Sequence, residues 1–179
     1  MTESLEIFNN QAINFASHGE YSEAIACFKK ALQFEQGNYL LWFNLGVTYR
    51  DSGDLIASQE ALERSLQLAE ECGQTGEDVI EALSQMLFMS GDFEGAIQYC
   101  ARGLEINIMN SRIWNTFGAV SFNLSAFDEA ANAFENALTV DPFYYDALFN
   151  LRDTYEKLGN EAGRIACSER LKELGQKEF

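Results

Sequence analysis

Polar and apolar residues alternate along this chain with the period of an α-helix. Within residues 39–72, Trp42, Leu45 and Tyr49 are three and four positions apart, and a second apolar series begins at Leu55 after a polar turn. Residues with this spacing share one face of a helix. The pattern predicts two antiparallel helices joined by a tight turn.

The turn between the two predicted helices recurs along the chain. Gly19, Gly53, Gly91 and Gly159 occupy the same place in similar phrases, and Ser125 takes that place once. The spacing is 34 residues, except for one interval that is four residues longer. A unit of this length cannot bury its own apolar face, so neighbouring units are expected to stack into a solenoid.

Other residues are repeated at fixed places within the units. The second unit carries Trp42, Leu45, Gly46, Tyr49 and Gly53, and the fourth carries Trp114, Phe117, Gly118, Ala130, Phe134, Ala137 and Pro142. This pattern resembles the tetratricopeptide repeat (TPR) family, whose 34-residue unit is a helix-turn-helix. The small residues mark places where two helices must approach closely.

The resemblance implies an all-α fold, a right-handed α-solenoid of about five helix-turn-helix units, of which the last acts as a cap. We expect a single TPR domain over residues 1–179. Its units are 5–38, 39–72, 77–110, 111–144 and a partly degenerate 145–179, with an insertion at 73–76.

Two segments depart from the repeat. The insertion at 73–76 either lengthens a helix or forms a loop, and Thr75 followed by Asp78 resembles a capping box that favours a new helix start. In the last helix, polar residues are expected to face water, as in a capping helix. Its inner face is expected to contain Ile165, Leu171 and Leu174.

The net charge of −16 changes the range of expected partners. It comes from 28 acidic and 12 basic residues. Such a field repels nucleic acid and anionic lipid, and it attracts basic or amphipathic peptides. The alternative is that the acidity only keeps the protein soluble. No stretch approaches membrane-spanning length, so we expect no membrane insertion.

Candidate chemistry is sparse. The only histidine, His18, falls at a turn, and no phosphate-binding, nucleophile or zinc motif is present. Cys27, Cys100 and Cys167 fall on second helices and are expected to be buried, reduced thiols. We therefore expect no catalytic residue, no cofactor and no metal, and a cytoplasmic protein that is not an enzyme.

TPR arrays bind peptides in the groove lined by their first helices, and the resemblance implies such a groove here. At the corresponding positions its centre is apolar and aromatic. The alternative is that these aromatic residues pack between units. The predicted peptide-binding groove contains Asn9, Ile13, Leu40, Phe43, Val47, Arg50, Glu81, Gln85, Phe88, Asn115, Phe122, Phe149 and Asp153.

The groove predicts a protein or peptide partner with apolar anchors and basic flanks. The function expected from this pattern is a non-enzymatic scaffold or adaptor. Two alternatives stay open, namely a self-assembling homo-oligomer and a chaperone for a secreted substrate.

Overall fold

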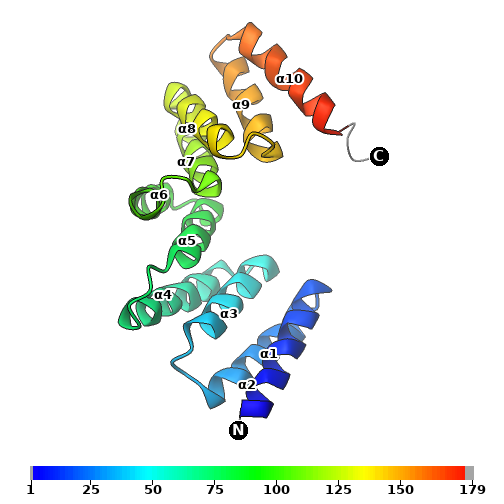
Figure 1. Cartoon of the computed structure of the whole chain (residues 1–179), viewed down its shortest axis with the longest axis vertical. Helices are drawn as coiled ribbons and strands as arrows, with labels where there is room; N and C mark the ends of the chain where they lie inside the picture. Colours follow the sequence, from blue (N-terminus) through cyan, green and yellow to red (C-terminus); the bar gives the residue numbers. More distant parts are fainter. Residues whose placement is uncertain (1, 176–179) are drawn as a thin grey trace. The chain divides into compact units, whose positions relative to one another are not determined.

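The computed structural model describes residues 2–175 and shows that this part of the chain is all-α, without a β-strand (Figure 1). The all-α prediction is thereby confirmed. Short turns join the ten helices of these residues. They are α1 (Thr2–Ser17), α2 (Tyr21–Phe34), α3 (Tyr39–Ser52), α4 (Leu55–Glu71), α5 (Glu77–Ser90), α6 (Phe93–Ile106), α7 (Ser111–Asn123), α8 (Phe127–Val140), α9 (Tyr145–Lys157) and α10 (Glu161–Gly175).

Consecutive helices pack as antiparallel pairs. The pairs α1 with α2, α3 with α4, α7 with α8, and α9 with α10 are in contact. In the second pair, the Ser58 hydroxyl donates to the carbonyl of Gly46 at 2.9 Å, and the Ser65 hydroxyl donates to that of Tyr39 at 2.8 Å. The later residue of α4 thus bonds the earlier residue of α3, as an antiparallel pair requires.

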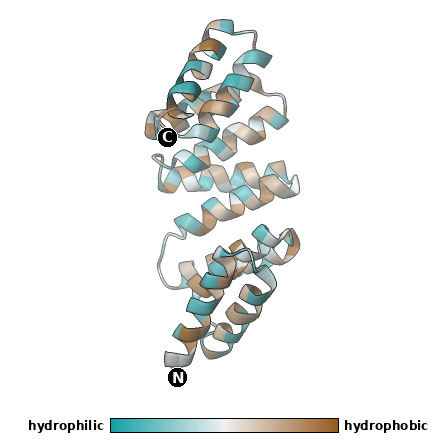
Figure 2. Cartoon of the chain, turned by 90° about the vertical axis from the view of Figure 1, so that its right-hand side faces the viewer, coloured by the Kyte–Doolittle hydropathy of each residue, from teal (hydrophilic) through white to brown (hydrophobic). Residues whose placement is uncertain are grey.

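The chain divides into two compact units, residues 1–90 and 91–179, and the boundary falls in the turn that follows α5. Each unit has its own apolar core. In the first, Ala12, Phe28 and Leu45 are buried together, and in the second Phe134 and Leu148 are. Figure 2 shows helices that carry both hydrophilic and hydrophobic residues, as expected of helices with one buried face. The assignment to a single domain stays a prediction.

The recurring turn has one backbone conformation. Gly19, Gly53, Gly91 and Gly159 have φ between 67° and 88°, and Ser125 has φ of 62°. This left-handed region is open to glycine and costs free energy for other residues. The repeated glycine in the sequence is therefore explained by the turn.

The predicted close approach between helices is also present. A Cβ atom added at Gly46 would lie 2.7 Å from Cγ of Leu62, and one added at Gly118 would lie 2.6 Å from the Phe134 ring. Such distances leave no room for a side chain. The two glycines are thus required by packing within the helix pairs.

The insertion both lengthens a helix and forms a loop. Helix α4 has 17 residues, whereas α2, α6 and α8 have 14. A loop with left-handed Gly73 and Gly76 then leads to α5. The predicted new helix start is confirmed, since α5 begins at Glu77; the residue directly before the helix is Gly76 and not Thr75, one position from the capping-box register.

The inner face of α10 differs from the prediction at one residue. Leu171 is buried and Leu174 packs against the core of the second unit, but Ile165 is exposed. The buried Cys167 takes its place on the inner face. Since a helix has 3.6 residues per turn, a residue two positions before Cys167 points to the opposite side.

Candidate functional site

The first helices of the N-terminal unit lie side by side, because α3 contacts both α1 and α5 (Figure 1). We call the side of α1, α3 and α5 that carries the predicted groove residues the first-helix face. Two large apolar side chains stand out on it. Ile13 is 48% exposed and Leu40 is 53% exposed, whereas Phe43 and Val47 are half-buried.

The insertion contributes to this face. Leu40 and Phe43 line a cavity of about 240 Å³, whose opposite wall is formed by residues 74–79. The cavity therefore combines two predicted groove residues with the loop that interrupts the repeat. The sequence offered the acidic residues of this segment as a signal, but not their proximity to Leu40.

Arg50 connects two helices of the first-helix face. Its guanidinium donates to Oε1 of Gln85 on α5 at 2.8 Å and pairs with the carboxylate of Asp51 at 2.9 Å. The charge of Arg50 is thus balanced locally. Glu81 and Phe88 lie on α5 and are half-buried.

Asn9 on α1 carries an unmatched polar atom. Its side-chain oxygen Oδ1 is buried and has no hydrogen-bond partner among the described residues. A buried acceptor without a partner costs about 1–3 kcal/mol.

In the C-terminal unit, α7 and α9 form the corresponding face. The side-chain amide of Asn150 donates to Oδ1 of Asn115 at 3.1 Å and so links the two helices. Phe122 packs against the core of this unit, and its ring contacts that of Phe127 edge to face at 5.3 Å. Asn115 and Phe122 therefore already have partners within the protein.

Of the two predicted aromatic residues on this face, Phe149 is exposed, at 40%, whereas Phe122 is half-buried. The guanidinium of Arg152 lies 4.1 Å from the centre of its ring and donates to Oδ1 of Asp153 at 2.7 Å. The three side chains form one cluster. Sequence reasoning missed Arg152, although its position three residues after Phe149 places both on one helix face.

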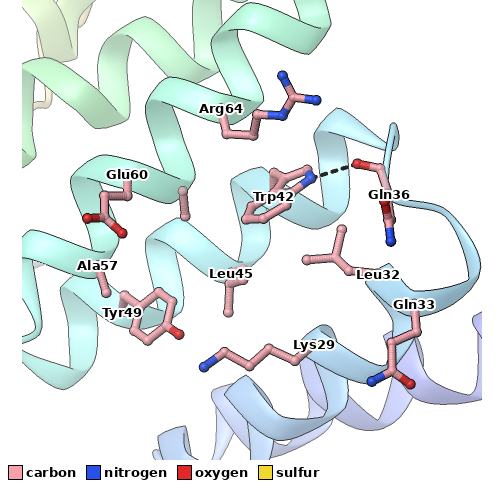
Figure 3. A pocket seen from close by; sticks show the side chains of 11 residues that line it. Lys29, Leu32, Gln33, Gln36, Trp42, Leu45, Tyr49, Ala57, Glu60 and Arg64 are labelled. Carbon is pink, nitrogen blue, oxygen red and sulfur yellow. Dashed lines mark hydrogen bonds between the residues drawn. The ribbon is translucent and has the colours of Figure 1, made fainter.

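A second cavity lies away from the predicted groove, between α2, α3 and α4, and has a volume of about 540 Å³ (Figure 3). We call it the α2–α4 pocket. The predicted groove residues take no part in it. Leu32, Trp42, Leu45 and Tyr49 form its apolar part, and Lys29 and Arg64 contribute positive charge.

Trp42 makes a hydrogen bond and lines the α2–α4 pocket. Its indole N–H donates to the carbonyl of Gln36 at 2.8 Å. Trp114 makes the same bond to the carbonyl of Ile108, also at 2.8 Å.

The cysteines behave as the sequence predicted. Cys27, Cys100 and Cys167 are buried, Cys72 is exposed, and all four are free. Burial raises the pKa of the Cys167 thiol and keeps it in its unreactive form. His18 is exposed at its turn, with Nδ1 2.8 Å from the carbonyl oxygen of Asn14.

The part of the chain that the structure describes brings no group of three His, Cys, Asp or Glu side chains together in a way that could hold a metal ion. Across residues 2–175, none of the helices combines the length and the apolar character needed to cross a bilayer.

Comparison with known protein families identifies three matching segments. Residues 14–55 match a model described as TPR repeat, and residues 39–72 and 122–163 match two models described as tetratricopeptide repeat.

Curated relatives match over most of this chain but over a small part of their own length. BBSome complex member BBS4 of Bos taurus is 25% identical over 73% of this chain and 24% of its own length. A TPR repeat-containing protein of Methanocaldococcus jannaschii is 27% identical over 87% of this chain and 30% of its own. This chain thus spans about a quarter to a third of these relatives.

Solved structures share the fold. A crystal structure of MamA protein matches with a TM-score of 0.79 and 22% identity, covering 99% of this chain and 95% of that one. The PilF structure from Pseudomonas aeruginosa matches with a TM-score of 0.84 and 15% identity, covering 96% of this chain and 77% of that one. At these identities the likeness concerns the fold alone.

Proposed function

Because this chain belongs to the tetratricopeptide repeat family, we propose that it is a non-enzymatic scaffold that binds an extended segment of a partner protein on its first helices. Repeats of this family generally serve protein–protein interaction. The name of the bovine relative describes that protein as a member of a complex, and membership of a complex also depends on protein–protein interaction.

The observation that carries the proposal is the exposed apolar surface of the first-helix face. Ile13 and Leu40 stay exposed although Leu41 and Leu45 fill the core beneath them. Exposed apolar groups that gather on one face are typical of interaction sites. The cavity beside Leu40 offers space for an apolar side chain of the partner.

Polar groups on the same face favour an extended segment with basic residues. Asp78 is exposed beside the Leu40 cavity, and Glu81 is half-buried on the same helix. These carboxylates suit lysine or arginine next to an apolar anchor.

A cytoplasmic location is part of this proposal. Four free cysteines, three of them buried, suit a compartment in which thiols stay reduced.

The test compares three baits in affinity capture from the native lysate, namely wild type, Ile13→Glu/Leu40→Glu and the control Ile56→Glu. Ile56 lies on α4 and is 78% exposed, so the control adds the same kind of charge at an exposed apolar residue of a second helix. We expect a partner that wild type and Ile56→Glu retain and that Ile13→Glu/Leu40→Glu loses. Calorimetry with the purified partner then gives the affinity of each bait.

Equal retention by the three baits would reject the first-helix face as the binding site. Self-assembly is one of the two alternatives, and sedimentation of wild type at high concentration tests it. If the protein forms oligomers that only Ile13→Glu/Leu40→Glu dissociates, the segment bound on this face belongs to a second copy.

A further inference from the structure

We propose that the α2–α4 pocket is a second binding site, which takes a partner segment carrying an aromatic or aliphatic side chain next to a carboxylate. The pocket is lined by α2, α3 and α4 and uses none of the predicted groove residues. Binding there is therefore independent of the first-helix face.

The pocket has the size and lining of a binding site. Its volume of about 540 Å³ falls within the range of roughly 300–1,000 Å³ that is typical of ligand sites. Figure 3 shows Leu32, Trp42 and Leu45 in the middle, with Lys29 and Arg64 on opposite sides of them. An apolar side chain placed at the centre would thus have a cation on either side.

The two cations have no carboxylate partner among residues 2–175. The Lys29 ammonium lies 5.5 Å from the centre of the Tyr49 ring, and Arg64 donates to the neutral Oε1 of Gln67 at 2.8 Å. One acid, Glu60, lines the pocket. The two cations outnumber this acid and give the pocket a positive charge, although the chain as a whole has 28 acidic and 12 basic residues.

The last repeat keeps a smaller cavity at the same place, of about 360 Å³, but its polar groups bond to one another or to the backbone. At the equivalent positions between α8, α9 and α10, Glu135 takes the place of Lys29, and Tyr155 and Arg170 take those of Tyr49 and Arg64. The Tyr155 hydroxyl donates to Glu135 at 2.6 Å, and Arg170 donates to the carbonyl of Pro142 at 2.7 Å. Both polar groups are used within the protein.

One substitution between the repeats accompanies the different partners of Arg64 and Arg170. The carbonyl of Gln36 is equivalent to that of Pro142 and accepts from the indole N–H of Trp42. In the last repeat Leu148, which has no donor, replaces Trp42, and the Pro142 carbonyl accepts from Arg170. Trp42 thus enlarges the apolar surface of the pocket, and Arg64 has only the neutral Gln67 as its partner.

Charge and shape together select the ligand class. A carboxylate would gain charge-assisted hydrogen bonds from Arg64 or Lys29, and a neighbouring apolar group would bury the pocket's apolar lining. A basic segment would meet two like charges. The pocket thus prefers an acidic segment, whereas the first-helix face suits a basic one.

The test follows the indole N–H resonances of the two tryptophans by ¹H–¹⁵N NMR during a peptide titration. The probe is acetyl-Gly-Glu-Phe-Glu-Gly-amide, and the control is the same peptide with lysine in place of glutamate. We expect a saturable shift of the Trp42 indole with the acidic probe alone. Trp114 makes the equivalent bond to Ile108 outside the pocket, so its resonance should stay in place.

Charge variants then locate the site. Lys29→Glu/Arg64→Glu should weaken binding of the acidic probe by about fivefold or more and should favour the lysine probe. The matched control, Lys30→Glu/Lys157→Glu, has the same net charge but changes two exposed lysines outside the pocket. It should bind the acidic probe about as wild type does. If the first variant does not fold, Lys29→Gln/Arg64→Gln tests the loss of charge instead.

Three results would overturn the inference: no saturable shift of Trp42, equal shifts with both probes, or equal weakening in the pocket variant and its matched control. None of these results bears on the proposed binding site on the first-helix face. That site is tested by Ile13→Glu/Leu40→Glu, which changes no residue of the pocket.

Discussion

Ser125 shows how a single residue can depart from the repeat while its backbone keeps the repeat's conformation. It is the non-glycine residue with positive φ in the described part of the chain, at 62°. Its neighbours fix this geometry, since the Ala126 N–H donates to the carbonyl of Ser121 at 2.9 Å, as the Asp54 N–H does to that of Tyr49. The tertiary context thus holds a serine where glycine is favoured.

We expect Ser125→Gly to raise the free energy of unfolding by about 0.5–1 kcal/mol. The substitution removes the left-handed penalty of about 1–2 kcal/mol, and the greater flexibility of glycine in the unfolded chain offsets part of the gain. Urea unfolding followed by circular dichroism measures the change. Gly159→Ser, at the equivalent turn, should lower stability by a similar amount, and a gain there would contradict the explanation.

At the scale of single elements, α8 lacks a cap that equivalent helices have. Asp54, Asp92 and Asn160 each accept a hydrogen bond from the backbone N–H three residues later, at 3.0–3.1 Å. Ala126 stands at the same position before α8 and makes no side-chain cap. One N–H of that helix therefore has no side-chain acceptor.

Ala126→Asn should stabilise the protein by about 1 kcal/mol, because its side chain can accept from the N–H groups that begin α8. Thermal and urea unfolding measure the change. The reverse substitution, Asn160→Ala before α10, should cost about the same. If Ala126→Asn left both unfolding midpoints unchanged, the N–H groups at the N-terminus of α8 would have to find their acceptors in another way.

Packing between helices also restricts which residues a helix can carry. Gly118→Ala should lower the free energy of unfolding by about 1–3 kcal/mol, because the added methyl group overlaps the buried ring of Phe134. This holds although alanine favours an isolated helix by about 1 kcal/mol. Gly37→Ala, in the turn between α2 and α3, controls for the added methyl group alone, since nothing lies within 4 Å of a Cβ there. A stable Gly118→Ala would mean that the ring can shift.

At the scale of the whole molecule, the dominant quantity is the charge of −16. The ion pairs of Arg50, Arg152 and Arg164 join residues one or three positions apart and lie near the surface. Such pairs contribute little to stability. Repulsion among the excess carboxylates should therefore exceed the attraction of these pairs.

We expect the Tm to rise by a few degrees when NaCl is increased from about 20 to 300 mM, because salt screens this repulsion. Calorimetry at constant pH measures the shift. Sodium fluoride at the same ionic strength controls for specific chloride binding. A Tm that falls with salt would show that ion pairs outweigh the repulsion.

The sequence by itself determined the helices, the turn at each repeat and the small residues at helix contacts. These features depend on residues that are near one another in the chain, so spacing and residue type suffice to reveal them. Gly53 and Gly118 are examples, since a left-handed turn and a close contact each select glycine. The residues of the predicted groove came instead from the resemblance to the tetratricopeptide repeat family.

The sequence did not reveal which of those residues are already engaged within the protein. Arg50 bonds Gln85 and Asn115 bonds Asn150, across helices separated by a full repeat. In the α2–α4 pocket, Trp42 likewise reaches the carbonyl of Gln36, and Arg64 has the neutral Gln67 as its partner. Only the tertiary structure decides such matters, because hydrogen bonds and charge pairing depend on the positions in space of groups that lie on different helices.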